Sequence, residues 1–200
     1  MNDNTYVRTL FGHEMDFYEP RAGQVFFSDI AHNLCNLARF QGGTYPLWTV
    51  GAHSLLVSGL AWSDGQPTEV VRWAFMHDFH EAYTGDIPTP LKRYLDGDAL
   101  GDAKGRVGVL AELETQLDKT ICEAFDVPYP GRIVRDIVKG YDAKAYDHEV
   151  EWFRSLTAPT LEPPPAVSPR TGLWGPGVQA FMDQTVFLFF KAGGKLGVIK

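Results

Sequence analysis

Residues 77–86 read His-Asp-Phe-His-Glu-Ala-Tyr-Thr-Gly-Asp, and this stretch governs the interpretation of the whole chain. It ends an apolar segment whose periodicity predicts a helix over residues 67–82, which breaks before the glycine of the stretch. In that helix, His77 and Glu81 lie four residues apart on one face. Asp78 is rotated by about 100° from His77. A histidine, a neighbouring aspartate and a later glutamate can bind a metal and transfer protons, so their partners elsewhere decide what they do.

Two further residues of metal-ligating type lie on other predicted helices, His53 on the preceding helix and Asp142 on a later one. Together with His77 and Asp78, they can converge on one ion at the shared edge of three helices. Two imidazoles and two carboxylates form a mixed nitrogen–oxygen set that suits Zn²⁺, Mn²⁺, Co²⁺ or Fe²⁺ better than Mg²⁺. Water in an open position of such a site becomes a nucleophile for phosphorus. Spacing alone leaves open that His53 is a buried structural histidine and Asp142 a surface acid.

Helical periodicity extends over most of the chain. Apolar residues recur at helical spacing, and prolines and glycines mark the ends of the segments. The predicted helices span about 28–42, 50–62, 67–82, 107–125, 132–156 and 177–192. Residues 1–25 are predicted to be irregular or weakly extended, and residues 157–176 to form a loop rich in proline and glycine. Strand signals are few, so we expect an all-α, single-domain helical bundle over residues 1–200.

Composition restricts the class of protein. The chain has 200 residues, 44% of them hydrophobic and 22% charged, as in ordinary globular domains. Its formal net charge of -7 argues against binding a nucleic-acid polymer, although a few focused cations can still bind a small anion. We expect no signal peptide and no membrane span, because no apolar run approaches the ~18 residues required. Cys35 and Cys122 are predicted to be reduced, buried thiols of a cytoplasmic protein.

The order of the four metal-ligating residues resembles the H…HD…D signature of the HD phosphohydrolase superfamily. More narrowly, segment 77–92 resembles the small 5'-deoxynucleotidases of bacteria. It is also similar to phage enzymes that hydrolyse dATP in viruses that use 2-aminoadenine in place of adenine. Further matches lie in segments 29–40 and 50–54, and the resemblance covers about residues 10–155. It implies a helical bundle of the HD-domain type.

The resemblance assigns the metal centre residue by residue. His53, His77, Asp78 and Asp142 would hold one divalent transition metal, which could be Zn, Co, Mn or Fe. An additional Mg²⁺ or Mn²⁺ could accompany a triphosphate substrate. Glu81 would act as the acid–base group beside the metal-bound water. Its alternative role is that of a carboxylate on the helix surface.

The resemblance also implies residues that contact the substrate. Asp86 would be a second catalytic carboxylate that positions water, protonates a leaving oxygen or binds the sugar, or else a turn residue that bonds its own backbone. Arg39 offers a planar fork for phosphate oxygens, and Phe40 can stack on a base. Lys92 and Lys139 would add positive charge, although each lysine taken alone is more often a solvated surface group.

The expected function is metal-dependent hydrolysis of deoxynucleotides. The favoured reaction is cleavage of dATP or another dNTP at the α-phosphorus, which gives deoxynucleoside and triphosphate. A 5'-deoxynucleotidase that acts on dNMPs and a regulatory nucleotide-binding protein without turnover are the alternatives. We expect a deoxynucleotide as the partner, in the host cytoplasm if the chain is phage-encoded. The apolar segment 177–192 favours a homo-oligomer, or else it covers the core of its own chain.

Overall fold

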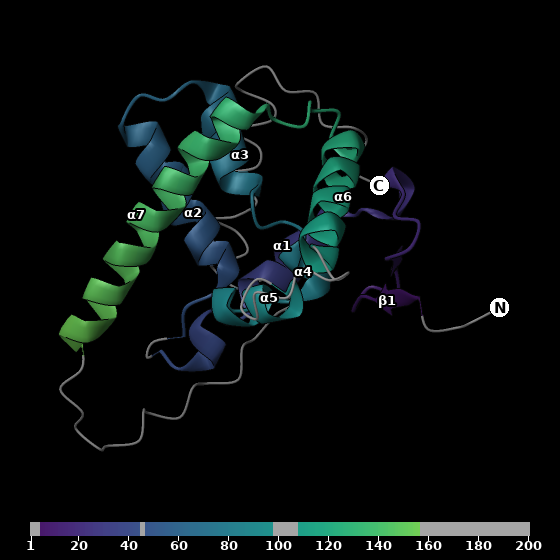
Figure 1. The fold of residues 1–200 in the computed structure, drawn as a ribbon, viewed down its shortest axis with the longest axis horizontal. Coiled ribbons are helices and arrows are strands. Elements are labelled where there is room, and N and C mark those ends of the chain that lie inside the picture. The colour runs from purple at the N-terminus through teal and green to yellow at the C-terminus, as the bar shows by residue number, and fades with distance from the viewer. Residues whose placement is uncertain (1–4, 45–46, 98–107, 157–200) are drawn as a thin grey trace.

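The computed structural model describes residues 5–44, 47–97 and 108–156, which fold mainly into helices (Figure 1). This confirms the mainly helical character expected from the sequence. The elements are β1 (Tyr6–Arg8), β2 (Glu14–Asp16), η1 (Ala22–Gln24), α1 (Phe27–Asn36), η2 (Phe40–Gly42), α2 (Val50–Ser63), α3 (Thr68–Met76), α4 (Glu81–Thr84), α5 (Thr89–Leu95), α6 (Val109–Ala124) and α7 (Arg132–Leu156). The expected loop 157–176 and helix 177–192 lie outside the described residues. No helix of the described part is long and apolar enough to cross a membrane.

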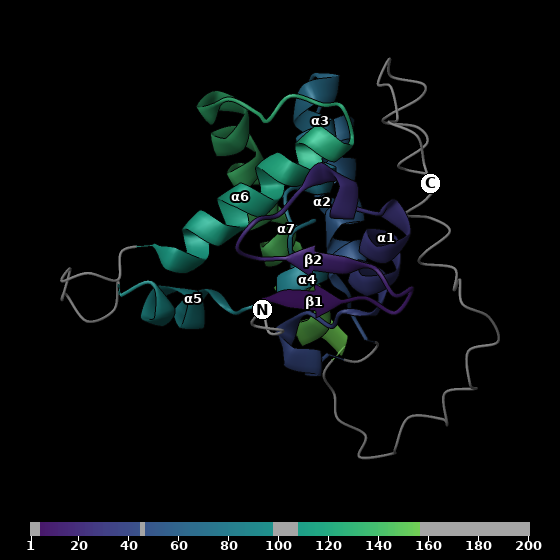
Figure 2. The same cartoon turned by 90° about the vertical axis from the view of Figure 1, so that its right-hand side faces the viewer.

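The N-terminal segment, which was expected to be irregular or weakly extended, contains a short antiparallel hairpin. Strands β1 and β2 pair with Val7 opposite Met15 (Figure 2). The turn between them includes Gly12 at a φ of 85°, a backbone conformation that glycine adopts without steric cost. Met15 is fully buried and Val7 packs against the core. Burial of these two side chains on one face explains why the segment forms strands.

Helices α2, α3 and α7 all contact one another and form the body that carries the site (Figure 1). The side chain of Thr49 caps α2 by accepting a hydrogen bond from the Ala52 N–H at 3.2 Å. Helix α1 crosses α2 closely at Gly51, where an added Cβ would lie 2.8 Å from Cys35 Sγ. Apolar side chains from these helices, among them Leu34, Val57 and Phe75, are fully buried between them.

The predicted helix 67–82 is broken in the structure. Helix α3 ends at Met76, and the Phe79 and Glu81 N–H groups bond the carbonyls three residues earlier, at Met76 and Asp78. Such bonds tighten the chain to about three residues per turn, which brings residues i and i+3 onto the same side. Asp78 and Glu81 therefore share a side, in place of the expected pairing of His77 with Glu81.

Two further differences lie at the edge of the site. The predicted helix 28–42 ends at Asn36, because the chain turns back and bonds the Arg39 N–H to the Trp48 carbonyl at 2.9 Å. Phe40 and Gln41 then adopt left-handed φ values of 54° and 51°, which is uncommon for residues with a side chain. Helix α5, which was not predicted, starts directly after the Gly-Asp-Ile-Pro turn. Helices α6 and α7 lie where the sequence predicted them.

Candidate metal centre and adjoining pocket

His53 lies on α2, with its side chain fully buried. Its Nδ1 donates a hydrogen bond to Glu149 Oε1 at 2.7 Å. Its Nε2 is 3.0 Å from Asp142 Oδ1 but has no aligned hydrogen-bond partner among the described residues. Burial lowers the pKa of His53, but the carboxylates of Asp142 and Glu149 outweigh burial and raise the pKa to about 9. The imidazole thus has one nitrogen held in place and one directed at a carboxylate.

His77 repeats this arrangement at the end of α3. Its Nδ1 donates to the Ala74 carbonyl at 2.8 Å, and its buried Nε2 has no hydrogen-bond partner within the described ranges. The two imidazole rings of His53 and His77 are centred 5.5 Å apart. A histidine whose Nδ1–H is used by an acceptor presents the Nε2 lone pair to a metal. Both imidazoles therefore have the hydrogen bonding of metal ligands.

The carboxylates complete the cluster. Ligand atoms of His53, His77 and Asp142 all lie within 4.8 Å of one another, so the three residues could hold a metal ion. Asp78 Oδ2 lies 3.3 Å from His77 Nε2 and 3.8 Å from His53 Nε2. Burial raises the pKa of Asp78, but the nearby histidines overcome burial and hold the pKa below its ordinary value. His53, His77 and Asp142 thus form a group that could hold a metal ion, and Asp78, the fourth predicted ligand, lies beside the two imidazoles.

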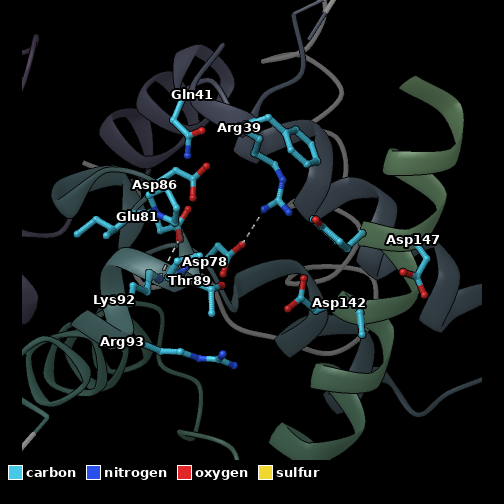
Figure 3. Close-up of a pocket in the computed structure, with 16 residues that line it drawn as sticks. Arg39, Gln41, Asp78, Glu81, Asp86, Thr89, Lys92, Arg93, Asp142 and Asp147 are labelled. Atoms are coloured by element: carbon cyan, nitrogen blue, oxygen red, sulfur yellow. Dashed lines mark hydrogen bonds and ion pairs between the residues drawn. The ribbon is translucent and has the colours of Figure 1, made fainter. Parts of the chain in front are cut away.

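A cavity of about 690 Å³ adjoins this cluster, within the size range of small-molecule sites. Asp78 and Asp142 belong both to the cluster and to the cavity wall (Figure 3). The rest of the wall comes from the η2 turn, from Glu81 at the start of α4, from α5 with the turn before it, and from α7. A ligand in the cavity would therefore lie directly beside the metal cluster.

Two of the three predicted substrate-binding cations line this cavity. Arg39 is largely buried, with Nη1 3.9 Å from Asp78 Oδ2 and Nη2 3.3 Å from Glu149 Oε2. Lys92 lines the opposite wall, and Arg93 beside it, which sequence reasoning missed, is a third cation (Figure 3). Lys139 does not belong to the cavity wall and is exposed on α7. Lys139 differs from Asp142 by only about 60° around the axis of α7, yet its side chain is exposed and does not reach the cavity wall.

The two predicted catalytic carboxylates also line the cavity. Glu81 is 4% exposed, and its Oε2 has no hydrogen-bond partner in the described part of the chain. Burial and the charge of Asp78 raise the pKa of Glu81 to about 8, against the opposing effect of Lys92. Burial likewise raises the pKa of Asp86, and the charge of Arg39 opposes the increase. A carboxyl whose pKa lies near neutrality can both accept and return a proton.

Aromatic side chains form the outer edge of the cavity. The rings of Phe40 and Tyr146 are centred 6.0 Å apart at an interplanar angle of 29°, and both residues line the cavity. Tyr146 lies four residues after Asp142, on the same side of α7. Sequence reasoning missed Tyr146, although this spacing from a predicted ligand could have indicated it.

A second polar cluster lies behind Glu81. His80 is buried, and its Nδ1 donates to Asp118 Oδ1 at 2.9 Å. Lys92 Nζ lies 2.9 Å from Glu114 Oε1 and 3.4 Å from Glu81 Oε1. His80, Glu114 and Asp118 were not among the site residues that the sequence predicted. The structure therefore links Glu81 and Lys92 to α6.

Comparison with known proteins gives relatives but no family. No protein-family profile matches the chain. The chain is 32% identical over 124 residues to the uncharacterized protein YfdR of Escherichia coli, a match that covers 62% of this chain and 60% of that protein. It is 35% identical over 129 residues to an uncharacterized protein of Rhodobacter capsulatus, covering 62% and 59%. The chain thus spans about three fifths of the length of these curated relatives.

Proposed function

We propose that this protein is a metal-dependent phosphohydrolase of the HD type that acts on deoxynucleotides. One observation carries the proposal. Two imidazoles, His53 and His77, direct Nε2 atoms without a hydrogen-bond partner in the described residues toward carboxylates at the wall of a 690 Å³ cavity. Buried polar atoms seldom stay without a partner unless they serve a ligand or an ion. Cationic side chains on the same cavity add the chemistry that a phosphate ester needs.

The roles of the residues follow from their positions. His53, His77, Asp78 and Asp142 would hold the metal. When bound, a divalent cation lowers the pKa of a coordinated water and withdraws charge from phosphoryl oxygens. Glu81 would take the proton from the attacking water, since its carboxyl lies on the cavity wall and its Oε2 has no partner among the residues described.

The remaining wall residues would bind the ester and complete the proton transfers. Asp86 would return a proton to the leaving 5'-oxygen or hold the sugar. Arg39 would bind the phosphate oxygens through its planar fork, beside the ligand Asp78. In these roles Glu81 gains the proton of the attacking water, Asp86 gives a proton to the 5'-oxygen, and the cationic guanidinium of Arg39 faces the negatively charged phosphate oxygens.

The choice of a triphosphate over a monophosphate rests on the number of cationic side chains that line the cavity. Arg39, Lys92 and Arg93 all lie on its wall and could each contact a phosphate group. We therefore propose attack of water at the α-phosphorus of a dNTP, which breaks the bond to the 5'-oxygen and yields deoxynucleoside and triphosphate. Phe40 and Tyr146 would stack on the base. A purine has the larger stacking face, so dATP is the proposed substrate.

Product analysis tests the proposal. The protein is incubated with each dNTP and each dNMP in the presence of Co²⁺ or Mn²⁺, and the products are separated by ion-exchange chromatography. A His77→Ala/Asp78→Ala variant controls for contaminating phosphatases. Deoxynucleoside with intact triphosphate, absent from the variant, would support the proposal. Release of orthophosphate from monophosphates alone would identify a 5'-deoxynucleotidase. Tight nucleotide binding without any product would identify a regulatory binding protein.

A further inference from the structure

We propose that Glu149 is a positioning residue that joins the metal centre to the phosphate-binding arginine, so that one buried carboxylate orients both. The inference rests on the proposed function, because it concerns the same site. Glu149 was not among the residues that the sequence indicated. Its side chain is completely buried between α7 and α2, and it is neither part of the cavity wall nor one of the residues that could hold the metal.

The position of Glu149 follows from its helix. It lies seven residues after Asp142 on α7, and two turns of a helix bring such residues to the same face. Helix α7 thus provides the proposed ligand Asp142 and, two turns further along the same face, the carboxylate of Glu149 that holds the proposed ligand His53. The packing of α7 against α2 places Glu149 beside His53.

Each carboxylate oxygen of Glu149 has a different task. Oε1 accepts hydrogen bonds from His53 Nδ1 at 2.7 Å and from Trp48 Nε1 at 2.8 Å. Oε2 forms an ion pair with Arg39 Nη2 at 3.3 Å, while Nη1 of the same guanidinium lies 3.9 Å from Asp78 Oδ2. Glu149 therefore connects a proposed metal ligand on one side with the proposed phosphate fork on the other.

The chemistry of these contacts defines what Glu149 would do. A carboxylate only accepts hydrogen bonds, so the proton shared with His53 belongs to Nδ1, and Nε2 keeps its lone pair for the metal. Partners of this kind orient the ligand and increase its basicity. The ion pair limits the rotamers of Arg39, which pre-organises its fork for phosphate oxygens. An ion pair with only a structural role would stabilise the fold. Its loss would not change the affinity for the metal and the affinity for phosphate by different amounts.

Substitution by glutamine separates the two tasks. In Glu149→Gln, the amide oxygen still accepts from His53 and Trp48, but an NH₂ group replaces the oxygen that faces Arg39. We expect Co²⁺ affinity to fall much less than in Glu149→Ala, because the amide keeps the hydrogen bond to His53 and loses only the carboxylate's effect on its basicity. Binding of inorganic triphosphate should weaken about tenfold, the change that corresponds to one hydrogen bond to a charged group. In Glu149→Ala, Co²⁺ affinity should also fall, by roughly 10–100-fold. Trp48→Phe is the matched control, because it removes only the second of the two hydrogen bonds to Oε1 and should change neither affinity.

The measurements do not depend on turnover. Co²⁺ affinity of the metal-free protein is measured by competition with a chromogenic chelator, and triphosphate binding to the Co²⁺-loaded protein by calorimetry. Circular dichroism checks folding, and the isosteric glutamine variant provides the test if the alanine variant does not fold. Equal loss of both affinities in Glu149→Gln, or wild-type affinities in a folded Glu149→Ala, would overturn the proposal. Separate effects on Co²⁺ and triphosphate without any hydrolysis of nucleotides would support the role of Glu149 and overturn the proposed function alone.

Discussion

Two buried histidine–carboxylate pairs lie near Asp78, and the hydrogen bond within each pair has almost the same geometry. His53 donates from Nδ1 to Glu149 at 2.7 Å, and His80 donates from Nδ1 to Asp118 at 2.9 Å. Each ring leaves Nε2 without a hydrogen-bond partner among the described residues. Burial lowers the pKa of both histidines, and the carboxylates raise each pKa to about 9. The pairs alone therefore do not indicate which one serves a metal.

The surroundings of the two Nε2 atoms make the difference. A second imidazole, that of His77, and the carboxylate of Asp142 lie close to His53 Nε2. Near His80, the carboxylate of Glu114 lies 3.8 Å from Nε2, and the ammonium of Lys92 already neutralises it at 2.9 Å. At His53 Nε2 the second imidazole and the carboxylate of Asp142 thus converge, while the nearby cation, Arg39, pairs with Glu149 and Asp78. At His80 Nε2 no second imidazole of the described residues is near, and the carboxylate of Glu114 already pairs with Lys92.

The largest expected effect distinguishes the clusters directly. His77→Ala removes one of the two imidazoles of the proposed metal site. Co²⁺ affinity should fall by more than the roughly 10–100-fold that losing an outer partner of a ligand costs. Chelator competition measures the affinity, and the hydrolysis assay should lose its product at the same time. His80→Ala is the paired control in the other cluster, and an equal loss of Co²⁺ affinity there would refute the distinction.

The second expected effect concerns stability rather than metal binding. Asp118→Asn replaces the charged partner of His80 inside the protein. The free energy of unfolding should decrease by about 1–3 kcal/mol, because a buried imidazole loses a charge-assisted hydrogen bond. Urea denaturation of the metal-free protein measures the change. Co²⁺ stoichiometry should stay that of the wild type, and a lost Co²⁺ site would show that the second cluster belongs to the metal centre.

The four residues that the sequence proposed as metal ligands do lie close to one another, and this could be predicted because they lie on, or directly after, helices with an apolar pattern. His53 follows a helix start that Thr49 caps, and Asp142 lies within a long helix that was predicted with the bounds observed. Periodicity fixes which face of such a helix is buried. Once α2, α3 and α7 pack on those faces, their polar residues at the edge have to meet.

The supporting residues could not be predicted in the same way. Glu149 and Asp118 are buried acids, yet in the sequence they resemble the exposed charges that surround them on α7 and α6. Their burial depends on a partner from a distant segment, and a local pattern contains no information on it. Lys139 shows the converse error, because closeness to Asp142 in sequence did not place it on the cavity. The left-handed turn at Phe40 also has no glycine to indicate it.

A smaller effect connects the second cluster with catalysis. Lys92 lowers the pKa of Glu81, which burial and Asp78 together raise to about 8. In Lys92→Met the pKa of Glu81 should rise further, so the carboxylate forms only at higher pH. The rising limb of the kcat/KM profile should therefore move to higher pH. Arg93→Met provides the control on the same wall, where substrate affinity should fall without any shift of the limb. A profile of Lys92→Met that coincides with the wild type would exclude Glu81 as the base.

The smallest expected effect uses Cys122 as a reporter of the second cluster. Burial, with a further contribution from the charge of Asp118, raises the pKa of the Cys122 thiol to about 12. Because only the thiolate reacts, a Cys35→Ala protein should react very slowly with a disulfide reagent at pH 8. Asp118→Asn removes the smaller contribution and should accelerate the reaction slightly, whereas Co²⁺ should leave the rate of the folded protein unchanged. If Co²⁺ changed the rate as much as Asp118→Asn does, the two clusters would be coupled through Asp78, and the contrast between them would fail.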